Sequence, residues 1–303
     1  MKRVLVLSFL LLLVLSSCEQ RKKKESSLVG RDSLKIEHEV KKELYGNWVG
    51  DFDVDEELYE LLALNDDLPQ DFDYNPKINL SLKRITADTV LGQNVVKGNM
   101  RPLIGRMEEN GASVSFIMDE PGDKRSDGRF EFRLEGDTLI GTWTAFDNKV
   151  KIKKRKFKLL KKQFAYNPNL MLPNEVELVD WKTSERREET VEDGDSTITF
   201  VNDFYRAASD AVFSINASKQ KLTEAELKNL KRLDLEIIRN TIFARHGYAF
   251  TKSGVRQFFD PVEWYVPISN EVSQELTQLE KDNISLLKKF EKYAEDNYDY
   301  FGR

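Results

Sequence analysis

Cysteine and histidine are nearly absent from this chain. Its 303 residues include one cysteine, Cys18, and two histidines, His38 and His246. A single cysteine excludes an internal disulfide, and so few histidines exclude a zinc site built mainly from imidazole ligands. We therefore expect no bound metal and no other cofactor.

Familiar catalytic motifs are also missing. The sequence contains no Gly-x-Ser-x-Gly turn, no His-Glu-x-x-His pair and no Gly-x-x-x-x-Gly-Lys-Ser/Thr phosphate loop. Because there are 52 acidic residues, a glycosidase pair chosen from Asp119, Glu120 and Asp127 has little specificity, and we expect these residues in solvated turns. We predict a noncatalytic protein, with a cell-wall hydrolase as the least favoured alternative.

Long hydrophobic runs are confined to the N-terminus. Val4–Leu15 is apolar except for Ser8 and follows the basic pair Lys2-Arg3. It is shorter than the roughly 20 residues that cross a bilayer, and it has the length and flanking charge of a signal peptide. Charged residues make up 33% of the chain and the net charge is −5. This balance indicates no nucleic-acid partner.

The end of that run, Leu15-Ser16-Ser17-Cys18, resembles the lipobox of bacterial lipoproteins. The resemblance implies that residues 1–17 are removed and that Cys18 is acylated, which makes a membrane the first partner. Several acyl chains would anchor the protein stably, whereas one would do so only marginally. Residues 18–42 are a predicted flexible tether, and Glu19 favours the outer membrane. The alternative is an ordinary secretory signal.

Residues 43–164 alternate between apolar and polar side chains in short segments, which predicts β-strands. The segments are Trp48–Val54, Ile78–Leu82, Thr89–Val96, Leu103–Met107, Ser113–Met118, Arg129–Leu134, Leu139–Ala145 and Lys156–Leu160. Eight such strands predict an antiparallel barrel, because closure removes the exposed edges. Asp127-Gly128 and Gly136-Asp137 are expected to form tight turns, and the acidic stretch Asp55–Asp73 a short helix or lid.

The segment that begins with Leu44 and contains Gly46-Asn47-Trp48 resembles the opening of lipocalin-like and calycin-like barrels, and Leu139–Trp143 resembles a late strand of them. The resemblance implies structural roles in closing the barrel for Gly46, Trp48 and Trp143. An eight-stranded barrel is either filled by its own side chains or holds one small ligand. We favour the filled core, and carriage of a small apolar ligand is the alternative function.

Residues 165–221 are predicted to form a linker that includes a candidate β-hairpin around the charged turn Arg186–Asp195. Residues 222–297 have a helical pattern. Thr223–Glu226 and Thr277–Glu280 have the form of capping boxes. Leu235, Ile238 and Ile242 share one helical face, and Gly247 is placed to end that helix in the left-handed conformation.

The segment Arg239–Tyr248, with Phe258-Phe259, Trp264-Tyr265 and Glu280 downstream, resembles the YARHG domain, a small module of exported bacterial proteins. Phe243 stands where the family usually has tyrosine. The resemblance implies a location outside the cytoplasm but no established activity.

The residues that we consider for a binding surface in this region are Arg239, Arg245, His246, Trp264 and Tyr265. Arginine can bind carboxylates at two points, and the aromatic rings can stack on a sugar. The alternative, which we favour, is structural: His246 interacts with the helix dipole, Arg239 ties helix ends together, and Trp264 and Tyr265 fill the core.

Together these patterns predict an α+β multidomain protein, in which an antiparallel eight-stranded β-barrel is followed by a small all-α domain. The predicted function is noncatalytic binding or scaffolding at the cell envelope. The expected partner is cell-wall glycan or an envelope protein. The expected location is extracytoplasmic and lipid-anchored, with the outer membrane favoured.

Overall fold

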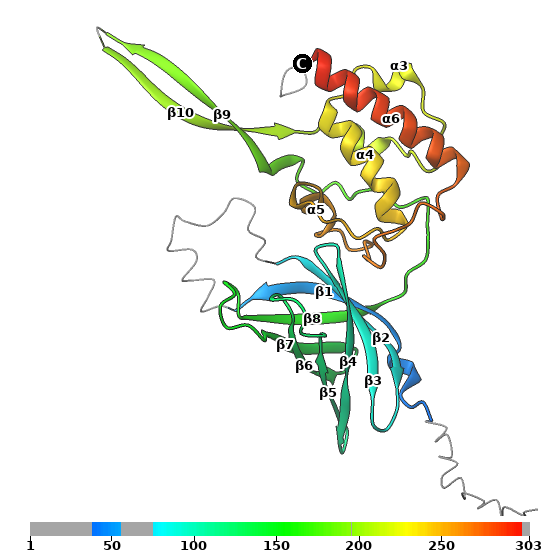
Figure 1. Cartoon of the computed structure of the whole chain (residues 1–303). Coiled ribbons are helices and arrows are strands. Elements are labelled where there is room, and N and C mark those ends of the chain that lie inside the picture. The colour runs from blue at the N-terminus through cyan, green and yellow to red at the C-terminus, as the bar shows by residue number, and fades with distance from the viewer. Residues whose placement is uncertain (1–37, 56–74, 195, 299–303) are drawn as a thin grey trace, which may run out of the picture. The chain divides into compact units, whose positions relative to one another are not determined.

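Eight antiparallel strands form a closed barrel (Figure 1). The computed structural model describes residues 38–55, 75–194 and 196–298, so Cys18, the predicted signal peptide and most of the acidic stretch lie outside the described residues. The strands are β1 (Gly46–Val54), β2 (Lys77–Ile85), β3 (Val90–Val96), β4 (Asn99–Asn110), β5 (Ser113–Asp119), β6 (Gly128–Glu135), β7 (Thr138–Ala145) and β8 (Lys154–Lys162). Because β1 pairs with both β2 and β8, the predicted barrel topology is confirmed.

Aromatic side chains fill the centre of the barrel. The rings of Phe52, Phe130 and Phe157 contact one another, with centroids 6.1, 6.2 and 5.8 Å apart. Phe116 stacks on Phe132 at 4.9 Å. All five side chains are buried, and each contributes roughly 1.5–3 kcal/mol of burial free energy. An apolar molecule carried in the centre would have to displace these rings, so the structure favours the filled core.

The two ends of the barrel are built differently. At one end lies the 3-10 helix η1 (Lys42–Leu44), whose Leu44 belongs to the barrel core. The indole Nε1 of the buried Trp48 donates to the Leu44 carbonyl at 2.9 Å. Gly46 has a φ of 118°, a conformation that favours glycine. Trp143 lies near the opposite end, in the last part of β7.

The two predicted glycine turns have different outcomes. Gly136, between β6 and β7, has a φ of 58°, as a tight turn requires. Gly128 is instead the first residue of β6. A Cβ atom at Gly128 would lie 2.5 Å from the indole ring of Trp143 and 2.4 Å from the carbonyl oxygen of Thr144. This glycine provides room for a side chain of the neighbouring strand, which a local turn pattern does not reveal.

A separate hairpin follows the barrel, formed by β9 (Val179–Asp193) and β10 (Ser196–Ala207). The sequence predicted a charged turn over Arg186–Asp195, but β9 continues through most of that segment. Charged residues are tolerated there because they have partners across the sheet. For example, Arg186 pairs with Asp203, with 3.3 Å between the guanidinium nitrogen and the carboxylate oxygen.

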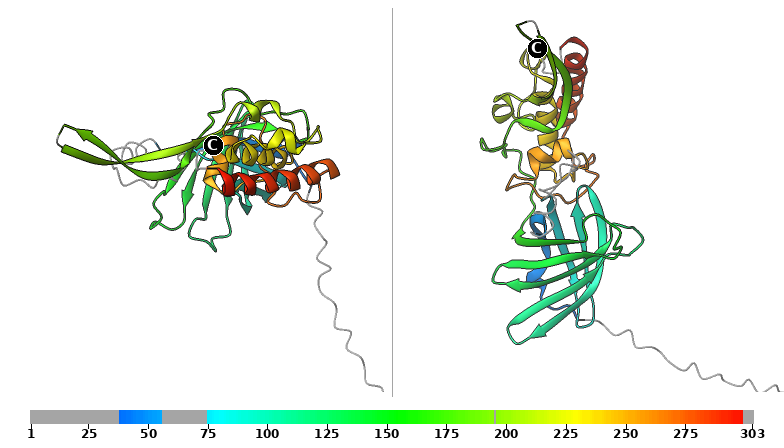
Figure 2. Two further views of the ribbon diagram at one scale, coloured as in Figure 1. Left: turned by 90° about the horizontal axis from the view of Figure 1, so that it is seen from above. Right: turned by 90° about the vertical axis from the view of Figure 1, so that its left-hand side faces the viewer.

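The C-terminal region of the described chain is helical, with five helices. They are α2 (Ala211–Ser214), α3 (Glu224–Leu227), α4 (Arg232–Arg245), α5 (Ser253–Phe259) and α6 (Gln278–Asn297). The helices α4 and α6, yellow and red in Figure 2, pack against each other. Both predicted capping boxes form. The closed barrel followed by these helices confirms the predicted α+β class. Within the described ranges, no helix is long and apolar enough to cross a membrane.

Hydrogen bonds and close packing join the barrel to the helical region. The Asn79 side-chain amide in β2 donates to the Pro267 carbonyl at 2.8 Å. A Cβ atom at Gly98, in the turn between β3 and β4, would lie 2.4 Å from the Thr251 side chain. The described residues accordingly belong to one compact unit.

Candidate binding sites

The Arg-His-Gly sequence lies where α4 ends. Arg245 is the last residue of α4, and Gly247 follows with a φ of 72°. The Arg245 side chain is buried, with Nε donating to the Leu170 carbonyl at 2.6 Å and Nη1 to the Ser218 hydroxyl at 2.9 Å. Burial lowers the pKa of Arg245 to about 10, so the guanidinium stays charged at neutral pH. Arg245 therefore holds the preceding linker against the helical core.

His246 and Glu280 form a second buried contact. His246 Nε2 lies 3.0 Å from Glu280 Oε2, and the two side chains are 4% and 0% exposed. Glu280 also belongs to the α6 capping box, where it accepts from the Thr277 backbone amide at 2.9 Å. The Tyr166 hydroxyl donates to the other Glu280 oxygen at 3.0 Å, and its ring stacks on His246. The cluster links the end of α4 to the start of α6.

The pKa values in this cluster follow from burial and hydrogen bonding. Burial alone would raise the pKa of Glu280. Hydrogen bonds from His246, Ser218 and the Thr277 backbone outweigh it and hold that pKa at about 2. Burial and the neighbouring Glu280 carboxylate raise the pKa of Tyr166 to about 12. At neutral pH Glu280 is therefore ionised, with hydrogen bonds to both oxygens.

The two predicted aromatic residues serve the helical core and its edge. Tyr265 is 1% exposed, and its hydroxyl donates to the Tyr248 carbonyl at 2.7 Å. Trp264 is half-buried, and its indole Nε1 donates to the Met171 carbonyl at 2.8 Å. Trp264 and Arg245 thus hold adjacent residues of the same linker segment.

The five predicted residues do not form the exposed surface that we considered from the sequence. Arg239 is half-buried and pairs with Glu291, with 2.5 Å between Nε and Oε1. Arg245, His246 and Tyr265 are buried. They are buried because each donates to or pairs with a group inside the domain, so their polar atoms face inward. This arrangement corresponds to the structural alternative.

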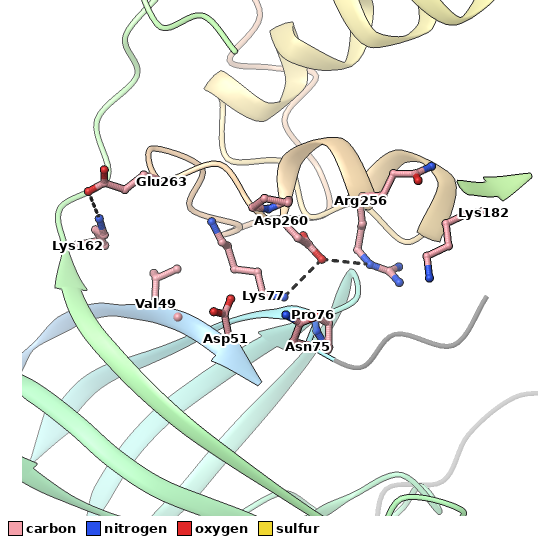
Figure 3. Close-up of a pocket in the computed structure, with 13 residues that line it drawn as sticks. Val49, Asp51, Asn75, Pro76, Lys77, Lys162, Lys182, Arg256, Asp260 and Glu263 are labelled. Carbon is pink, nitrogen blue, oxygen red and sulfur yellow. Dashed lines mark hydrogen bonds and ion pairs between the residues drawn. The ribbon is translucent and has the colours of Figure 1, made fainter. Parts of the chain in front are cut away.

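A cavity of about 600 Å³ lies between the barrel and α5 (Figure 3). Lys77, at the start of β2, is buried there, and its ammonium donates to the Val262 carbonyl at 2.5 Å. Burial lowers the pKa of Lys77 to about 8. Asp260 accepts from the Lys77 backbone amide at 3.4 Å and pairs with Arg256 at 3.6 Å. These charged groups hold the barrel and the helical region together.

A different cavity, of about 330 Å³, opens at the barrel end beside Trp143, and we call it the barrel mouth. Its buried polar residues are Asn94 and Glu120, 2% and 8% exposed. Glu120 accepts from Asn94 Nδ2 at 2.9 Å, the Gly128 backbone amide at 2.7 Å and Trp143 Nε1 at 3.1 Å. Burial raises the pKa of Glu120 although these bonds oppose it. These hydrogen bonds fix the Trp143 indole and the Asn94 side-chain amide at the base of the cavity.

Apolar rings and basic side chains surround this base. Phe52 and Phe130 lie beside Trp143 and line the cavity with it. The basic residues that line the barrel mouth are Lys97, Arg101, Lys124, Lys151 and Arg155. Arg155 lies over the Phe52 ring, 5.3 Å from its centroid. Glu120 is the one acidic residue among the described lining residues. Arg101 is paired with Asp123 and Asp127, so the excess of positive charge at the barrel mouth comes from the other basic residues.

Asp127 supports the loop that carries Lys124. It is 1% exposed and accepts from Arg101 at 2.5 Å, from the Gly122 amide at 3.0 Å and from the Lys124 amide at 3.2 Å. The sequence expectation that Glu120 and Asp127 lie in solvated turns is therefore wrong. Both are buried because each accepts backbone hydrogen bonds from the β5–β6 connection or its flank.

Asp119, the third candidate carboxylate, forms an exposed ion pair with Arg129 at 2.7 Å. In the part of the chain that the structure describes, no three His, Cys, Asp or Glu side chains are grouped so as to hold a metal ion. The barrel mouth was not predicted from the sequence. A usable signal was present, because residues 149–162 contain nine basic residues and no acidic one.

Comparison with known proteins identifies the helical region. Residues 211–292 match the YARHG domain family. The protein therefore has a C-terminal YARHG domain, and the buried Arg245 and His246 contacts belong to it. Such domains occur in extracellular or periplasmic proteins. No curated protein and no solved structure matches the chain.

Proposed function

We propose that this protein is a lipid-anchored, noncatalytic binding protein of the cell envelope, and that its barrel mouth binds a small anion with an apolar body. The observation that carries the proposal is the arrangement of three lysine side chains, Lys97, Lys124 and Lys151, over a buried aromatic base. Arg101 and Arg155 also line the cavity, but Arg101 pairs with Asp123 and Asp127, and Arg155 donates to the Phe52 carbonyl. Ammonium and guanidinium groups bind carboxylate, phosphate or sulfate. The cavity volume of about 330 Å³ falls at the lower end of small-molecule sites, which span roughly 300–1,000 Å³.

The filled centre of the barrel limits where such a ligand can bind. Phe52 and Phe130 form both the base of the mouth and the top of the aromatic core. A ligand would therefore place its apolar part on these rings and Trp143. Its charged group would lie at the lysine rim, which we define as Lys97, Lys124 and Lys151. The first barrel segment, with Gly46 and Trp48, resembles that of lipocalin-like proteins, and this resemblance supports a small-ligand role for the barrel. In this protein the ligand would bind at the barrel mouth.

A pair of fluorescent probes tests whether binding at the barrel mouth requires a negatively charged ligand. Anilinonaphthalene sulfonate carries an anionic group on an aromatic body, and phenylnaphthylamine is its neutral relative. We expect the chain lacking residues 1–18 to bind the sulfonate more tightly than the neutral probe. Replacing both Lys124→Ala and Lys151→Ala should weaken sulfonate binding about thirtyfold, since each nearby charge contributes on the order of 1 kcal/mol and about 1.4 kcal/mol is a factor of ten.

The matched control for that experiment is the pair Lys281→Ala and Lys288→Ala, on the exposed side of α6. It changes the net charge equally but lies outside the barrel mouth. Equal losses in the two double variants would mean that the probe senses only overall charge. Equal affinity for the neutral and the charged probe would also contradict the proposal.

Anchoring and location are supported by two observations from the sequence and its family. The segment Leu15–Cys18 resembles a lipobox, and YARHG domains occur outside the cytoplasm. We expect the native protein to fractionate with membranes and Cys18→Ala to abolish acylation, as metabolic labelling with a fatty acid would measure. Unchanged labelling of the variant would contradict lipid attachment at Cys18. Cell-wall glycan and envelope proteins are the proposed macromolecular partners, and co-sedimentation with purified sacculi tests the first.

A further inference from the structure

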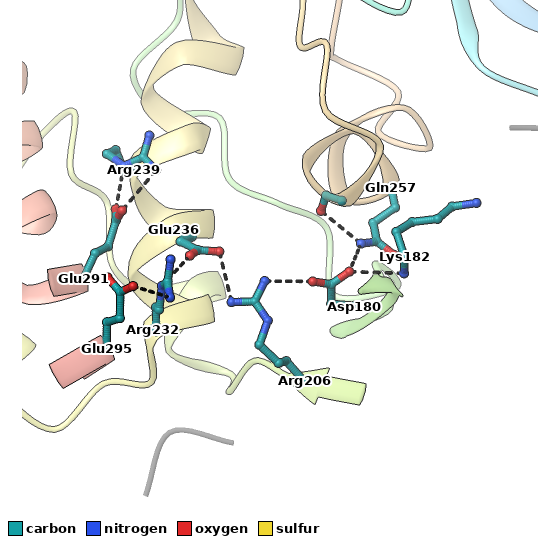
Figure 4. Close-up of polar contacts among 10 residues, drawn as sticks. Asp180, Lys182, Arg206, Arg232, Glu236, Arg239, Gln257, Glu291 and Glu295 are labelled. Carbon is teal, nitrogen blue, oxygen red and sulfur yellow. Dashed lines mark hydrogen bonds and ion pairs between the residues drawn. The ribbon is translucent and has the colours of Figure 1, made fainter. Parts of the chain in front are cut away.

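The base of the β9–β10 hairpin is fixed to the helical domain by a polar network (Figure 4). Asp180 is 1% exposed and accepts from Arg206 at 2.8 Å and from Gln257 of α5 at 2.6 Å. Arg206 also pairs with Glu236 of α4 at 3.4 Å. Glu236 in turn pairs with Arg232 at 2.9 Å. The hairpin therefore leaves the domain in a defined direction.

The outer hairpin, which we define as residues 186–194 and 196–202, extends away from the helices (Figure 1 and the left view of Figure 2). Four of its apolar side chains are exposed: Val191 by 50%, Ile198 by 52%, Phe200 by 38% and Val201 by 59%. Among the described residues β10 pairs only with β9. A hairpin of two strands is marginally stable in water, and three or more strands are needed for independent stability, so a partner that pairs with one of its edges would stabilise it.

The two edges of the outer hairpin differ in charge. The β9 edge contains five charged residues from Arg186 to Glu192, namely Arg186, Arg187, Glu188, Glu189 and Glu192. The β10 edge has none from Ser196 to Asn202, and its sequence there is rich in threonine, β-branched and aromatic residues. Charged residues protect a free edge from strand pairing, whereas an uncharged edge of high β-propensity favours it. The edge available for pairing is therefore that of β10.

We propose that this edge pairs antiparallel with the β10 edge of a second copy of the chain, which forms a four-stranded sheet. A two-fold axis at Phe200 would place Phe200 opposite the partner's Phe200. Thr197 would lie opposite the partner's Asp203, and Ile198 opposite the partner's Asn202. No two like charges face each other in this register, and aromatic pairs across strands are favourable.

The same register brings three of the four exposed apolar residues together on one face of the sheet, while Val201 lies on the other face. Ile198 pairs with Val191 within one hairpin, and Phe200 lies two residues along on the same face. The dimer would therefore join Val191, Ile198 and Phe200 of both copies into one apolar strip. Self-pairing is favoured over a charged partner strand because the β10 edge offers such a strand no counter-charge between Ser196 and Asn202. A two-fold interface of this kind closes on itself and does not continue into a fibre.

Sedimentation equilibrium of the chain lacking residues 1–18, which keeps every described element, tests this dimer. We expect a monomer–dimer equilibrium, and we expect Phe200→Lys to raise the dimer dissociation constant more than tenfold. That change places two ammonium groups opposite each other and removes the contact between the two Phe200 rings. Thr190→Lys is the control, because Thr190 lies on the β9 strand and is already exposed.

Cross-linking gives a second readout that does not depend on disrupting the strand. The chain lacking residues 1–18 has no cysteine, so Phe200→Cys introduces a single thiol at the proposed two-fold axis. Mild oxidation should form a disulfide dimer with Phe200→Cys and not with Thr190→Cys. A chain that stays monomeric, a dimer that Phe200→Lys and Thr190→Lys affect equally, or equal cross-linking of both cysteine variants would overturn the proposal. Each of these results leaves ligand binding at the barrel mouth unaffected, so the two proposals fail independently.

Discussion

The protein buries polar groups in two regions, and the two differ in what faces the solvent. In the YARHG domain, Arg245, His246 and Glu280 direct their polar atoms toward one another or toward other groups inside the domain. At the barrel mouth, Glu120 and Asn94 are also buried and hydrogen-bonded. There, however, the polar base is covered by a cavity with basic residues around it. The first region is closed, and the second opens into the cavity of the barrel mouth.

This difference separates structural from functional charge. A buried cation with all its donors engaged has no capacity left for a ligand, whereas removing it leaves partners unsatisfied. Rim lysines contribute little to folding, because exposed charges interact weakly in water. The comparison predicts that substitutions in the YARHG cluster reduce stability, and that substitutions at the barrel mouth reduce binding.

The largest effect is expected for Arg245→Met. The change removes the donors to the Leu170 carbonyl and the Ser218 hydroxyl while it keeps most of the side-chain volume. Each buried acceptor left without its donor costs about 1–3 kcal/mol, and urea unfolding followed by circular dichroism would measure the loss. Lys124→Met is the matched control at the barrel mouth and should change the free energy of unfolding by less than about 0.5 kcal/mol. Similar losses in both variants would contradict the division between the regions.

The next effect is a pH dependence of opposite sign in the two regions. The pKa of Glu280 is about 2 in the folded protein and 4.5 in the unfolded chain. The unfolded state therefore takes up the proton first as the pH falls. Stability from Glu280 is therefore present above pH 4.5 and is lost toward pH 2, by about 3 kcal/mol. Glu280→Gln should remove this loss in urea titrations at several pH values.

Glu120 provides the contrast because burial raises its pKa in the folded state. The folded protein then takes up the proton first, so this carboxyl favours the folded state as the pH falls through its raised pKa toward 4.5. Glu120→Gln should remove that gain and leave the Glu280 contribution in place. Identical changes in the pH profile for the two glutamine variants would rule out this interpretation.

The sequence predicted the barrel well because its signals are local. Alternation of apolar and polar residues defined all eight strands. Strands that follow one another in the sequence are also neighbours in the barrel. The two capping boxes and the left-handed Gly247 were also predicted correctly, since each depends on residues within one helical turn.

The two polar regions were predicted poorly because they depend on contacts between distant residues. Arg245 meets Leu170 across 75 positions, and Glu120 meets Asn94 across 26. A single sequence does not reveal that Glu120 faces inward, because an Asp-Glu-Pro-Gly stretch is also typical of a solvated turn. The charged run of β9 was likewise assigned to a turn, although its partners on β10 allow it to continue as a strand.

The smallest effect, and the one most specific to the barrel mouth, is expected for Gly128→Ala. The new methyl group would meet the Thr144 carbonyl oxygen and the Trp143 ring at 2.4–2.5 Å, so the indole must move. We expect a loss of about 1–3 kcal/mol in stability, as for overpacked sites, together with weaker binding of anilinonaphthalene sulfonate.

Gly136→Ala is the control, because its φ of 58° makes alanine unfavourable while no atom lies within 4 Å of the added Cβ. It should cost about 1–2 kcal/mol without changing probe affinity. If Gly128→Ala bound the probe like the native chain, the position of Trp143 would not matter for binding, and the aromatic base could not be part of the site.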